Sequence, residues 1–296
     1  MLPLWRQGGI NSEPNSMAKT KLSSIWFSLL SKLLKLSFFN QNGVAYIFYN
    51  VTQYKIFLSP GFGAVYNISS DLAYLGMFIV RKDLRRQGIG AKLWSAMMAS
   101  AGERNVCLDG AKAMVPWYTK QGFVHRGHRV VLHTVRVTQA MKLGGAHAAI
   151  KVASLGNGMW PMLLDYDRKV YRNLDRNCRE RILRACLGDA DVKAVMATNV
   201  TGVVGYGSIH RKENDAYGIR YVYADDADVV DALLRTLLVD VPEGSLLYFW
   251  PVVGKDVPGR LRGGDLKTYE TGLRMYTKAK LDIDENYAWL VSAHLP

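Results

Sequence analysis

The spacing of apolar residues changes from strand-like to helical at one place in the first half of the chain. Residues 74–80 are a continuous apolar run, which is typical of a buried strand. Ile89, Leu93, Ala96 and Met97 then recur at helical spacing, so we expect a helix that begins near residue 89. Two glycines stand just before this helix. The pattern therefore predicts a strand, a glycine turn and a helix in that order.

The remaining apolar runs predict a mixed α/β chain with two domains. Glycine, alanine and serine are frequent over residues 138–158, which indicates a linker. A length of 296 residues is enough for two domains of ordinary size. A helix is expected over 175–187, and strands are expected over 44–49, 54–58, 64–68, 104–109, 124–137, 192–198, 203–210 and 218–223.

The N-terminal segment is the least regular part of the chain. Residues 1–20 are polar and predict disorder. Residues 21–39 can form an amphipathic helix, but Lys32 and Lys35 make the run too charged and too short for a transmembrane segment. Three interpretations stay open: a helix packed on the sheet, a helix on a membrane surface, and a targeting or disordered segment. No tidy cleavage site follows, so we expect a cytoplasmic protein.

Composition narrows the class of protein, and charge adds a clue to the ligand. Hydrophobic residues make up 49% of the chain, which predicts a folded protein with a sizeable core. Three cysteines without a CxxC spacing indicate neither a disulfide framework nor a metal site. Residues 1–150 hold 18 Lys and Arg against 5 Asp and Glu, whereas residues 151–296 hold 20 of each. The excess of +13 therefore lies with the glycine turn, and it suits a nucleotide or a nucleic acid.

The glycine turn is a candidate anion site. Arg81, Lys82 and Arg85 precede Gly88 and Gly90. Glycines leave backbone N–H groups unobstructed, and a helix N-terminus adds a partial positive charge, so the turn suits a phosphate or pyrophosphate. The Gly-Lys-Ser/Thr of a Walker loop and the three glycines of a dinucleotide fingerprint are both absent. An ordinary connection with glycine caps is the alternative.

Two motifs together resemble the GNAT N-acetyltransferase superfamily. The sequence Arg85-Arg-Gln-Gly-Ile-Gly90 after an apolar strand resembles the acyl-coenzyme A loop of that family. Downstream, Val115-Pro-Trp-Tyr-Thr-Lys-Gln-Gly-Phe123 resembles its segment of the form Phe-Tyr-x-Lys-x-Gly-Phe. The motifs have the order and separation of the family. The resemblance implies a GNAT fold, acetyl-CoA as co-substrate, no metal, and transfer of an acetyl group to an amine.

The resemblance also implies the site residues. Tyr118 resembles the general acid that protonates the departing thiolate; packing beside Trp117 is the other interpretation of this tyrosine. Backbone N–H groups of Phe78 and Val80 are expected to bind the pantetheine arm. The full set of residues expected to bind the coenzyme is Phe78, Ile79, Val80, Arg85, Arg86, Gln87, Gly88, Ile89, Gly90 and Ala91.

The layout from residue 71 to about 280 resembles the two-domain GNAT proteins of the YitH kind. This resemblance implies an N-terminal segment over 1–40, a GNAT domain over 41–137, the linker over 138–158 and a second, diverged GNAT-like domain over 159–296. In the second domain, Asp225, Asp226, Asp228 and Asp231 stand where a coenzyme loop would be. Asp225 is expected to cap the next helix. Carboxylates repel pyrophosphate, so no coenzyme is expected there.

Three functional classes stay open on the sequence. An acetyltransferase needs a base or a water chain to deprotonate its amine, but residues 73–80 contain no carboxylate, and Asp71 and Asp109 are the nearest acids. Ala111 also replaces an Asn that is usual in the family. Both departures favour a silent acyl-CoA-binding protein as the second class. Charge alone favours a nucleic-acid-binding protein as the third, and no nucleic acid is expected.

Overall fold

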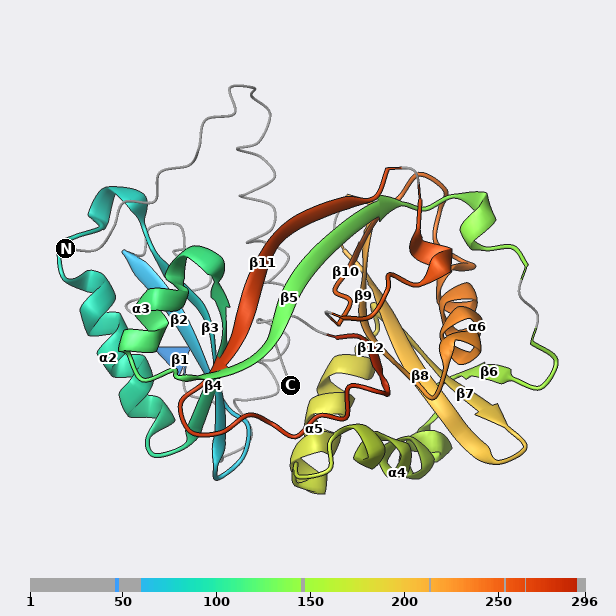
Figure 1. Ribbon diagram of the computed structural model, residues 1–296, viewed down its shortest axis with the longest axis horizontal. Coiled ribbons are helices and arrows are strands. Elements are labelled where there is room, and N and C mark those ends of the chain that lie inside the picture. The colour runs from blue at the N-terminus through green and yellow to red at the C-terminus, as the bar shows by residue number, and fades with distance from the viewer. Residues whose placement is uncertain are drawn as a thin grey trace. The chain divides into compact units, whose positions relative to one another are not determined.

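The computed structural model describes residues 46–47, 60–144, 147–212, 214–252, 254–263 and 265–291, which form two compact units (Figure 1). The first unit ends at Arg104 and the second begins at Asn105. The expectations for the N-terminal helix over 21–39 and for a strand over 54–58 lie outside the described residues. No helix among the described residues is long and apolar enough to cross a membrane.

The first unit is an antiparallel sheet with one helix against it. Its strands are β1 (Tyr46–Ile47), β2 (Gly61–Asn67) and β3 (Leu72–Val80), and β2 lies between the other two. The 3-10 helix η2 (Lys82–Leu84) and then α2 (Ile89–Ala101) follow β3 (Figure 1). Both the core strand and the helix after the glycines are therefore confirmed.

Close packing of α2 on β2 depends on a glycine. A Cβ atom added at Gly63 would lie 2.3 Å from the sulfur of Met97, so any larger residue would push the helix off the strand. Leu93, Trp94 and Met97 of α2 are buried against the sheet. This packing fixes the N-terminus of α2 next to the end of β3.

The second unit has a larger mixed sheet. Its strands run in the order β4-β11-β5-β10-β9-β8-β7-β6, with β12 paired to β9; β10 and β9 are parallel and the other pairs are antiparallel. The strand bounds are β4 (Asn105–Ala111), β5 (His125–Arg136), β6 (Lys151–Ser154), β7 (Val192–Asn199), β8 (Gly202–Arg211), β9 (Ala216–Ala224), β10 (Leu246–Phe249), β11 (Lys267–Tyr276) and β12 (Ala288–Leu290).

Alternation along the strands gives this sheet two apolar faces. Val195 and Ala197 of β7 face a cluster with α6 (Ala227–Leu238), whereas Ala194 and Met196 face a cluster with α4 (Trp160–Val170) and α5 (Arg176–Leu187). Figure 1 shows α6 apart from α4 and α5 on these two faces. The unit also contains α3 (Val115–Lys120) and the 3-10 helices η3 (Lys112–Met114), η4 (Gln139–Met141), η5 (Asn157–Met159) and η6 (Gly259–Leu261).

Strand β11 lies between β4 and β5, although it is more than 130 residues away from β5 along the chain. Arg274 of β11 pairs with Asp109 of β4, and Leu273 pairs with Arg129 of β5. Figure 1 shows β5 and β11 running side by side as long curved strands. The C-terminal part of the chain thus completes the sheet around β4.

The expected fold class, a mixed α/β sheet with helices, is confirmed. Strands β7, β8 and β9 and helix α5 lie where periodicity predicted them. The range 138–158 contains η4 and β6, and β6 pairs with β7. The proposed domain limits stay a prediction.

One helix cap was placed wrongly by the sequence. Asp226, not Asp225, is the N-cap of α6, because its carboxylate accepts a hydrogen bond from the Val229 N–H at 2.9 Å. Asp225 instead accepts a hydrogen bond from the Tyr166 hydroxyl at 2.8 Å and lies 3.8 Å from the Lys169 amine.

Candidate functional site

The turn between β3 and α2 is an open loop that ends in a left-handed glycine. Gly88 is the N-cap of α2, with φ of +79°, and a Cβ atom added to it would have no heavy atom within 4 Å. The first four N–H groups of a helix have no partner within the helix, and the first turn of α2 contains no acidic residue. Such a helix start suits an anion that approaches the glycine closely.

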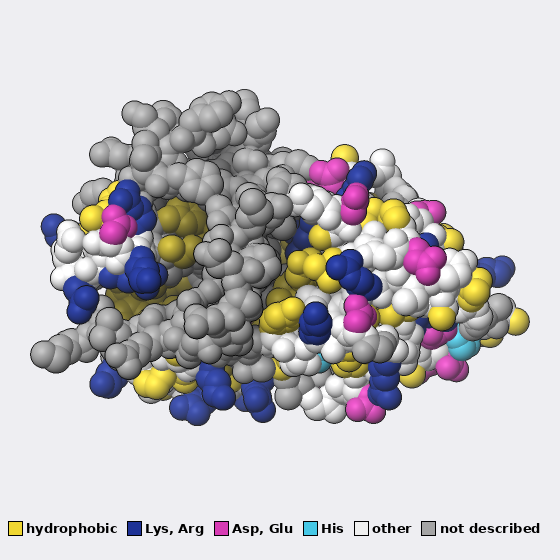
Figure 2. All heavy atoms as spheres, turned by 90° about the horizontal axis from the view of Figure 1, so that it is seen from above, with side chains coloured by type: hydrophobic (Ala, Val, Ile, Leu, Met, Phe, Trp, Pro, Cys, Tyr) yellow, Lys and Arg dark blue, Asp and Glu magenta, His cyan; other side chains and the backbone are white. Residues whose placement is uncertain are grey.

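Basic side chains surround this loop. Arg81, Lys82, Arg85, Arg86 and Lys92 face a single acidic neighbour in the same stretch, Asp83. Arg81 forms an ion pair with Asp83, and its guanidinium lowers the pKa of that carboxyl. Arg81 therefore offsets Asp83, and the other cations leave the loop positive. On the face shown in Figure 2, dark-blue Lys and Arg side chains outnumber magenta acidic ones toward the left.

The end of β3 directs backbone groups away from β2. The Arg81 N–H donates to the Pro60 carbonyl at 3.1 Å, so the adjacent Val80 peptide groups point to the other side of the strand. Phe78 lies two residues earlier, where the pairing of β2 with β3 shifts register. The Arg85 Nε donates to the Val80 carbonyl at 3.0 Å, which joins the loop to the end of β3. Phe78 also packs on Trp94 of α2, with ring centroids 5.4 Å apart.

Two residues near the loop have a strained backbone that the sequence did not indicate. Met77 in β3 has φ of +56° and Arg86 has φ of +66°. A left-handed non-glycine residue costs about 1–3 kcal/mol and is found most often at binding and catalytic sites. The pairing of β2 with β3 shifts register here, between the pairs Phe62↔Ile79 and Ala64↔Gly76. A bulge of this kind re-aims the residues after it.

The structure places the expected coenzyme residues in one continuous segment of the first unit. Five of them are exposed or lie at the open glycine, namely Arg85, Arg86, Gln87, Gly88 and Ala91, and the Ile79 side chain is 49% exposed. The other four are half-buried: Phe78, Val80, Ile89 and Gly90. Their binding role itself stays a prediction.

Tyr118 lies in the second unit, on the short helix α3. Its ring packs edge-on against Trp117 and Phe123, with centroids 5.1 and 6.1 Å away. A Cβ atom added at Gly110 of β4 would lie 2.9 Å from the Tyr118 ring, so the glycine makes room for it. Burial raises the pKa of Tyr118 to about 12. The phenol is therefore fully protonated at neutral pH.

The two acids considered for the base have different surroundings. Asp71 is exposed and accepts a hydrogen bond from the Ser69 hydroxyl in its own turn. Asp109 accepts two hydrogen bonds from Arg274, one of them from Nη2 at 3.0 Å. Side-chain exposure is 1% for Arg274 and 10% for Asp109. Asp109 is thus held in an ion pair and is a poor candidate for a free base.

Sequence reasoning missed Arg274. Asp109 gave a signal, because an acidic residue directly after an apolar run needs a buried partner, but residues 267–276 are not an apolar run and gave no signal for Arg274. Their separation of 165 residues concealed the pairing. His128 lies close to Arg274, and burial lowers the pKa of His128 to about 3.

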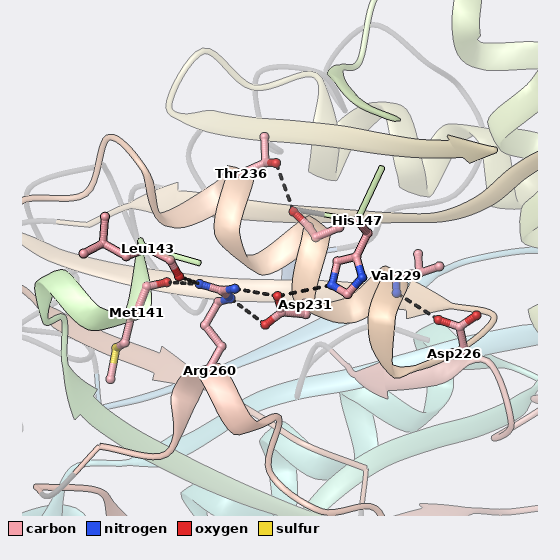
Figure 3. Close-up of polar contacts among 9 residues, drawn as sticks. Met141, Leu143, His147, Asp226, Val229, Asp231, Thr236 and Arg260 are labelled. Carbon is pink, nitrogen blue, oxygen red and sulfur yellow. Dashed lines mark hydrogen bonds and ion pairs between the residues drawn. The ribbon is translucent and has the colours of Figure 1, made fainter. Parts of the chain in front are cut away.

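In the second unit three of the four aspartates at the start of α6, Asp225, Asp226 and Asp231, have partners within the protein. Asp231 accepts hydrogen bonds from Arg260, whose Nη1 also donates to the carbonyls of Met141 and Leu143 at 2.7 and 2.9 Å (Figure 3). The His147 Nε2 lies 3.6 Å from Asp231 (Figure 3). These contacts and the Asp226 cap give the segment a structural role.

The histidines of β5 differ in burial. His125 is exposed. His133 is half-buried and stacks on Phe249 with centroids 5.5 Å apart. Among the described residues, no group of three or more His, Cys, Asp or Glu could hold a metal ion. Cys107 is buried.

Comparison with known proteins finds a family model that matches part of the chain and solved structures with a similar fold. Residues 40–143 match the family model described as "Acetyltransferase (GNAT) domain", a range that includes the glycine loop and Tyr118. Holothin acyltransferase from Pseudoalteromonas sp. (strain SANK 73390) is 24% identical over 185 residues, which are 62% of this chain. The match covers 58% of that relative, so this chain spans less than two thirds of its length.

Solved structures resemble the chain over most of its length. A putative acetyltransferase from Pyrococcus horikoshii superposes with a TM-score of 0.56 and 17% identity, covering 79% of this chain and 75% of that one. A tandem GNAT protein from the clavulanic acid biosynthesis pathway has a TM-score of 0.55 and 14% identity, covering 74% and 78%. These likenesses confirm a GNAT-like fold. The closer resemblance to the YitH kind stays a prediction.

Proposed function

We propose that this protein is an acetyl-CoA-dependent N-acetyltransferase. The observation that carries the proposal is the Gly88 loop: an open left-handed glycine at a helix N-terminus, among basic side chains, behind a strand whose outer backbone groups point away from its neighbour. The family match over residues 40–143 and the name of the curated relative support acyl transfer as the reaction class.

The loop fits the phosphates of coenzyme A. Backbone N–H groups at Gly88, Ile89, Gly90 and Ala91 would bind the pyrophosphate, because the first turn of a helix leaves them without helical partners. A helix dipole contributes only about 0.3–1 kcal/mol, so these hydrogen bonds must supply most of the binding. Basic side chains of the loop would add charge-assisted contacts. Phe78 and Val80 would offer their backbone N–H groups to the pantetheine arm.

Tyr118 is proposed as the general acid of the reaction. When the C–S bond of the acyl donor breaks, the electron pair stays on sulfur and the Tyr118 hydroxyl supplies the proton, so that a neutral thiol leaves. The amine nitrogen forms the new C–N bond and loses its proton to water or a base. Because Asp109 is paired with Arg274, we propose that a water chain takes this proton.

A coenzyme-binding protein without catalysis is the second candidate. It is favoured by the absence of a carboxylate in β3 and by the ion pair that occupies Asp109. Saturable binding of acetyl-CoA without turnover on any amine of a broad panel would select this candidate. Turnover on one of them would select the enzyme.

A substitution at Gly88 tests the binding site directly. Gly88→Glu puts a carboxylate where the pyrophosphate is expected, so calorimetric titration should show at least a hundredfold loss of affinity, about 2.7 kcal/mol. Gly102→Glu is the matched control, because Gly102 is also exposed with positive φ but stands at the other end of α2. The control should bind coenzyme A like the parent. Equal affinity in Gly88→Glu and the parent would contradict the proposed site.

A further inference from the structure

A second basic site lies on the sheet of the second unit, away from α6. Lys212 follows β8 and folds back over Gly218, where an added Cβ atom would lie 2.8 Å from the Lys212 Cε and 2.5 Å from the His210 Cε1. The Lys212 amine lies 4.7 Å from the centroid of Tyr248 and 5.6 Å from that of Trp250. Glycine at position 218 therefore leaves the space that brings the amine to two aromatic rings.

A second cation is directed to the same place by a bulge. The pairing of β8 with β9 passes from Ser208↔Tyr221 to Ile209↔Ile219, so Arg220 is the extra residue of β9. Arg220 lies close enough to both His210 and Lys212 to lower the pKa of each. Together with burial it lowers the pKa of Lys212 to about 8. The amine is still mostly protonated at neutral pH.

These cations have no described anionic partner. Among the described residues, no carboxylate forms an ion pair with Lys212 or Arg220, whereas the neighbouring Arg211 pairs with Asp215. Lys212 and Arg220 are half-buried, and partial desolvation of a charge without a counter-charge is costly. Stacking on Tyr248 and Trp250 offsets only part of that cost.

A buried hydroxyl on the same face also lacks a partner. Ser208 is fully buried, and its Oγ has no hydrogen-bond partner among the described residues. It lies two residues before His210 on β8, so both side chains are on one face of the strand. A buried polar group without a protein partner requires another one, which an ordered water or a bound ligand can supply.

We propose that Lys212, Arg220 and Ser208 line a binding site for a small organic carboxylate whose apolar part packs on Tyr248 and Trp250. The two cations supply the counter-charge for the carboxylate, and the rings explain why its body should be apolar rather than a bare inorganic ion. All of these residues belong to the second unit, whereas the coenzyme loop belongs to the first.

Benzoate is the probe, with benzamide and inorganic phosphate as comparisons, and binding to the full-length protein is measured by calorimetry. We expect saturable benzoate binding with Kd near or below about 10 mM. Benzamide has the same shape without the charge and should bind at least about tenfold more weakly. Tighter binding of phosphate than of benzoate would overturn the assignment to a carboxylate.

Two variants remove the cations of the proposed site, and two matched controls remove cations that lie outside it. Lys212→Met and Arg220→Gln should each weaken benzoate at least about tenfold, since a hydrogen bond to a charged group is lost. Lys255→Met removes another lysine that lies over an aromatic ring, Trp289 at 4.4 Å, and Arg211→Gln removes the paired neighbour. Both controls should keep parental affinity. Unchanged affinity in folded Lys212→Met and Arg220→Gln, or no saturable binding in the parent, would overturn the proposal.

Discussion

Tyr118 is buried against Trp117 and Phe123, and this burial raises the pKa of its phenol to about 12. An exposed thiol has a pKa near 8.5, so a phenol of pKa 12 would give it a proton only against about 5 kcal/mol. Burial acts on thiols in the same way, however, and raises the pKa of Cys107 in the same unit to about 12. A leaving thiolate in similarly dry surroundings would match the phenol. Proton donation by Tyr118 therefore requires a site that excludes water.

Substitution of Tyr118 by Phe separates the proton donor from a packing tyrosine. The ring stays, so acetyl-CoA should bind nearly as in the parent, whereas kcat should fall at least about a hundredfold because a general acid contributes about 10²–10⁴ in rate. Both quantities are measured on the same preparation. Turnover within about threefold of the parent would remove Tyr118 from the mechanism.

Tyr221→Phe is the matched control for that experiment. Tyr221 is a buried tyrosine of the same unit, and its hydroxyl is 3.7 Å from the Cys186 sulfur. The substitution removes a buried hydroxyl that has no role in the proposed reaction. Its kcat should stay close to the parental value, which would show that the loss in Tyr118→Phe is not a general effect of a missing hydroxyl.

Local signals explain which residues the sequence could identify. The glycines and basic residues of the loop lie within ten positions of one another, so they are close in space whatever the tertiary structure. Arg274 and Lys212 meet their partners only through sheet pairing and were not identified. The strain at Met77 and Arg86 also left no signal, because neither is a residue type that favours positive φ.

At the scale of single elements, helix α6 shows where local rules stop. Asp225 and Asp226 are equally good N-cap residues, so the sequence alone cannot choose between them. Tyr166 and Lys169 of α4 both contact Asp225 in the folded protein. The choice of Asp226 as the cap thus depends on a neighbouring helix about 60 residues earlier.

Removing the cap tests this assignment. Asp226→Ala should lower the free energy of unfolding by about 1 kcal/mol, within a usual range of about 0.5–2, because the Val229 N–H loses its acceptor. Asp228→Ala is the control, since Asp228 lies in the first turn but makes no capping bond in the structure, and it should cost less. Urea unfolding measures both. An equal loss in the two variants would mean that only helix-dipole charge is at work.

Strand periodicity predicted most strands of both units, but it could not predict their order. Residues 192–198, 203–210 and 218–223 follow one another as antiparallel neighbours, which is the arrangement expected for consecutive strands. Strand β11 breaks that rule by pairing with β4 and β5. Nothing in its apolar pattern specifies a partner so distant in the chain.

At the scale of the whole molecule, β11 makes the C-terminal part of the chain necessary for the sheet around β4. Without residues 267–276, both β4 and β5 would lose the strand that lies between them. A fragment of residues 151–296 would conversely leave β11 without its partners. Experiments on either half of the chain alone would therefore test a different structure, and variants of the full chain are preferable.

The ion pair between Arg274 and Asp109 gives the sharpest test of this long-range pairing. Arg274→Met should lower the free energy of unfolding by about 3–5 kcal/mol, because it leaves a carboxylate that is 10% exposed without its counter-charge. The double variant Arg274→Met, Asp109→Leu should recover much of the loss, since an apolar pair of similar volume needs no counter-charge.

Arg211→Met in the exposed pair with Asp215 is the matched control and should change stability by no more than about 1 kcal/mol. Urea unfolding compares the parent, Arg274→Met, Asp109→Leu, the double variant and the Arg211→Met control, and Arg274→Lys provides a charged variant if the methionine protein is too unstable to purify. If the pair is buried, the double-mutant cycle at positions 109 and 274 should give a strong coupling energy, because each single variant leaves the other charge without its partner. Additive effects at positions 109 and 274 would show that the two side chains are solvated separately, and β11 would then not be held between β4 and β5 by this contact.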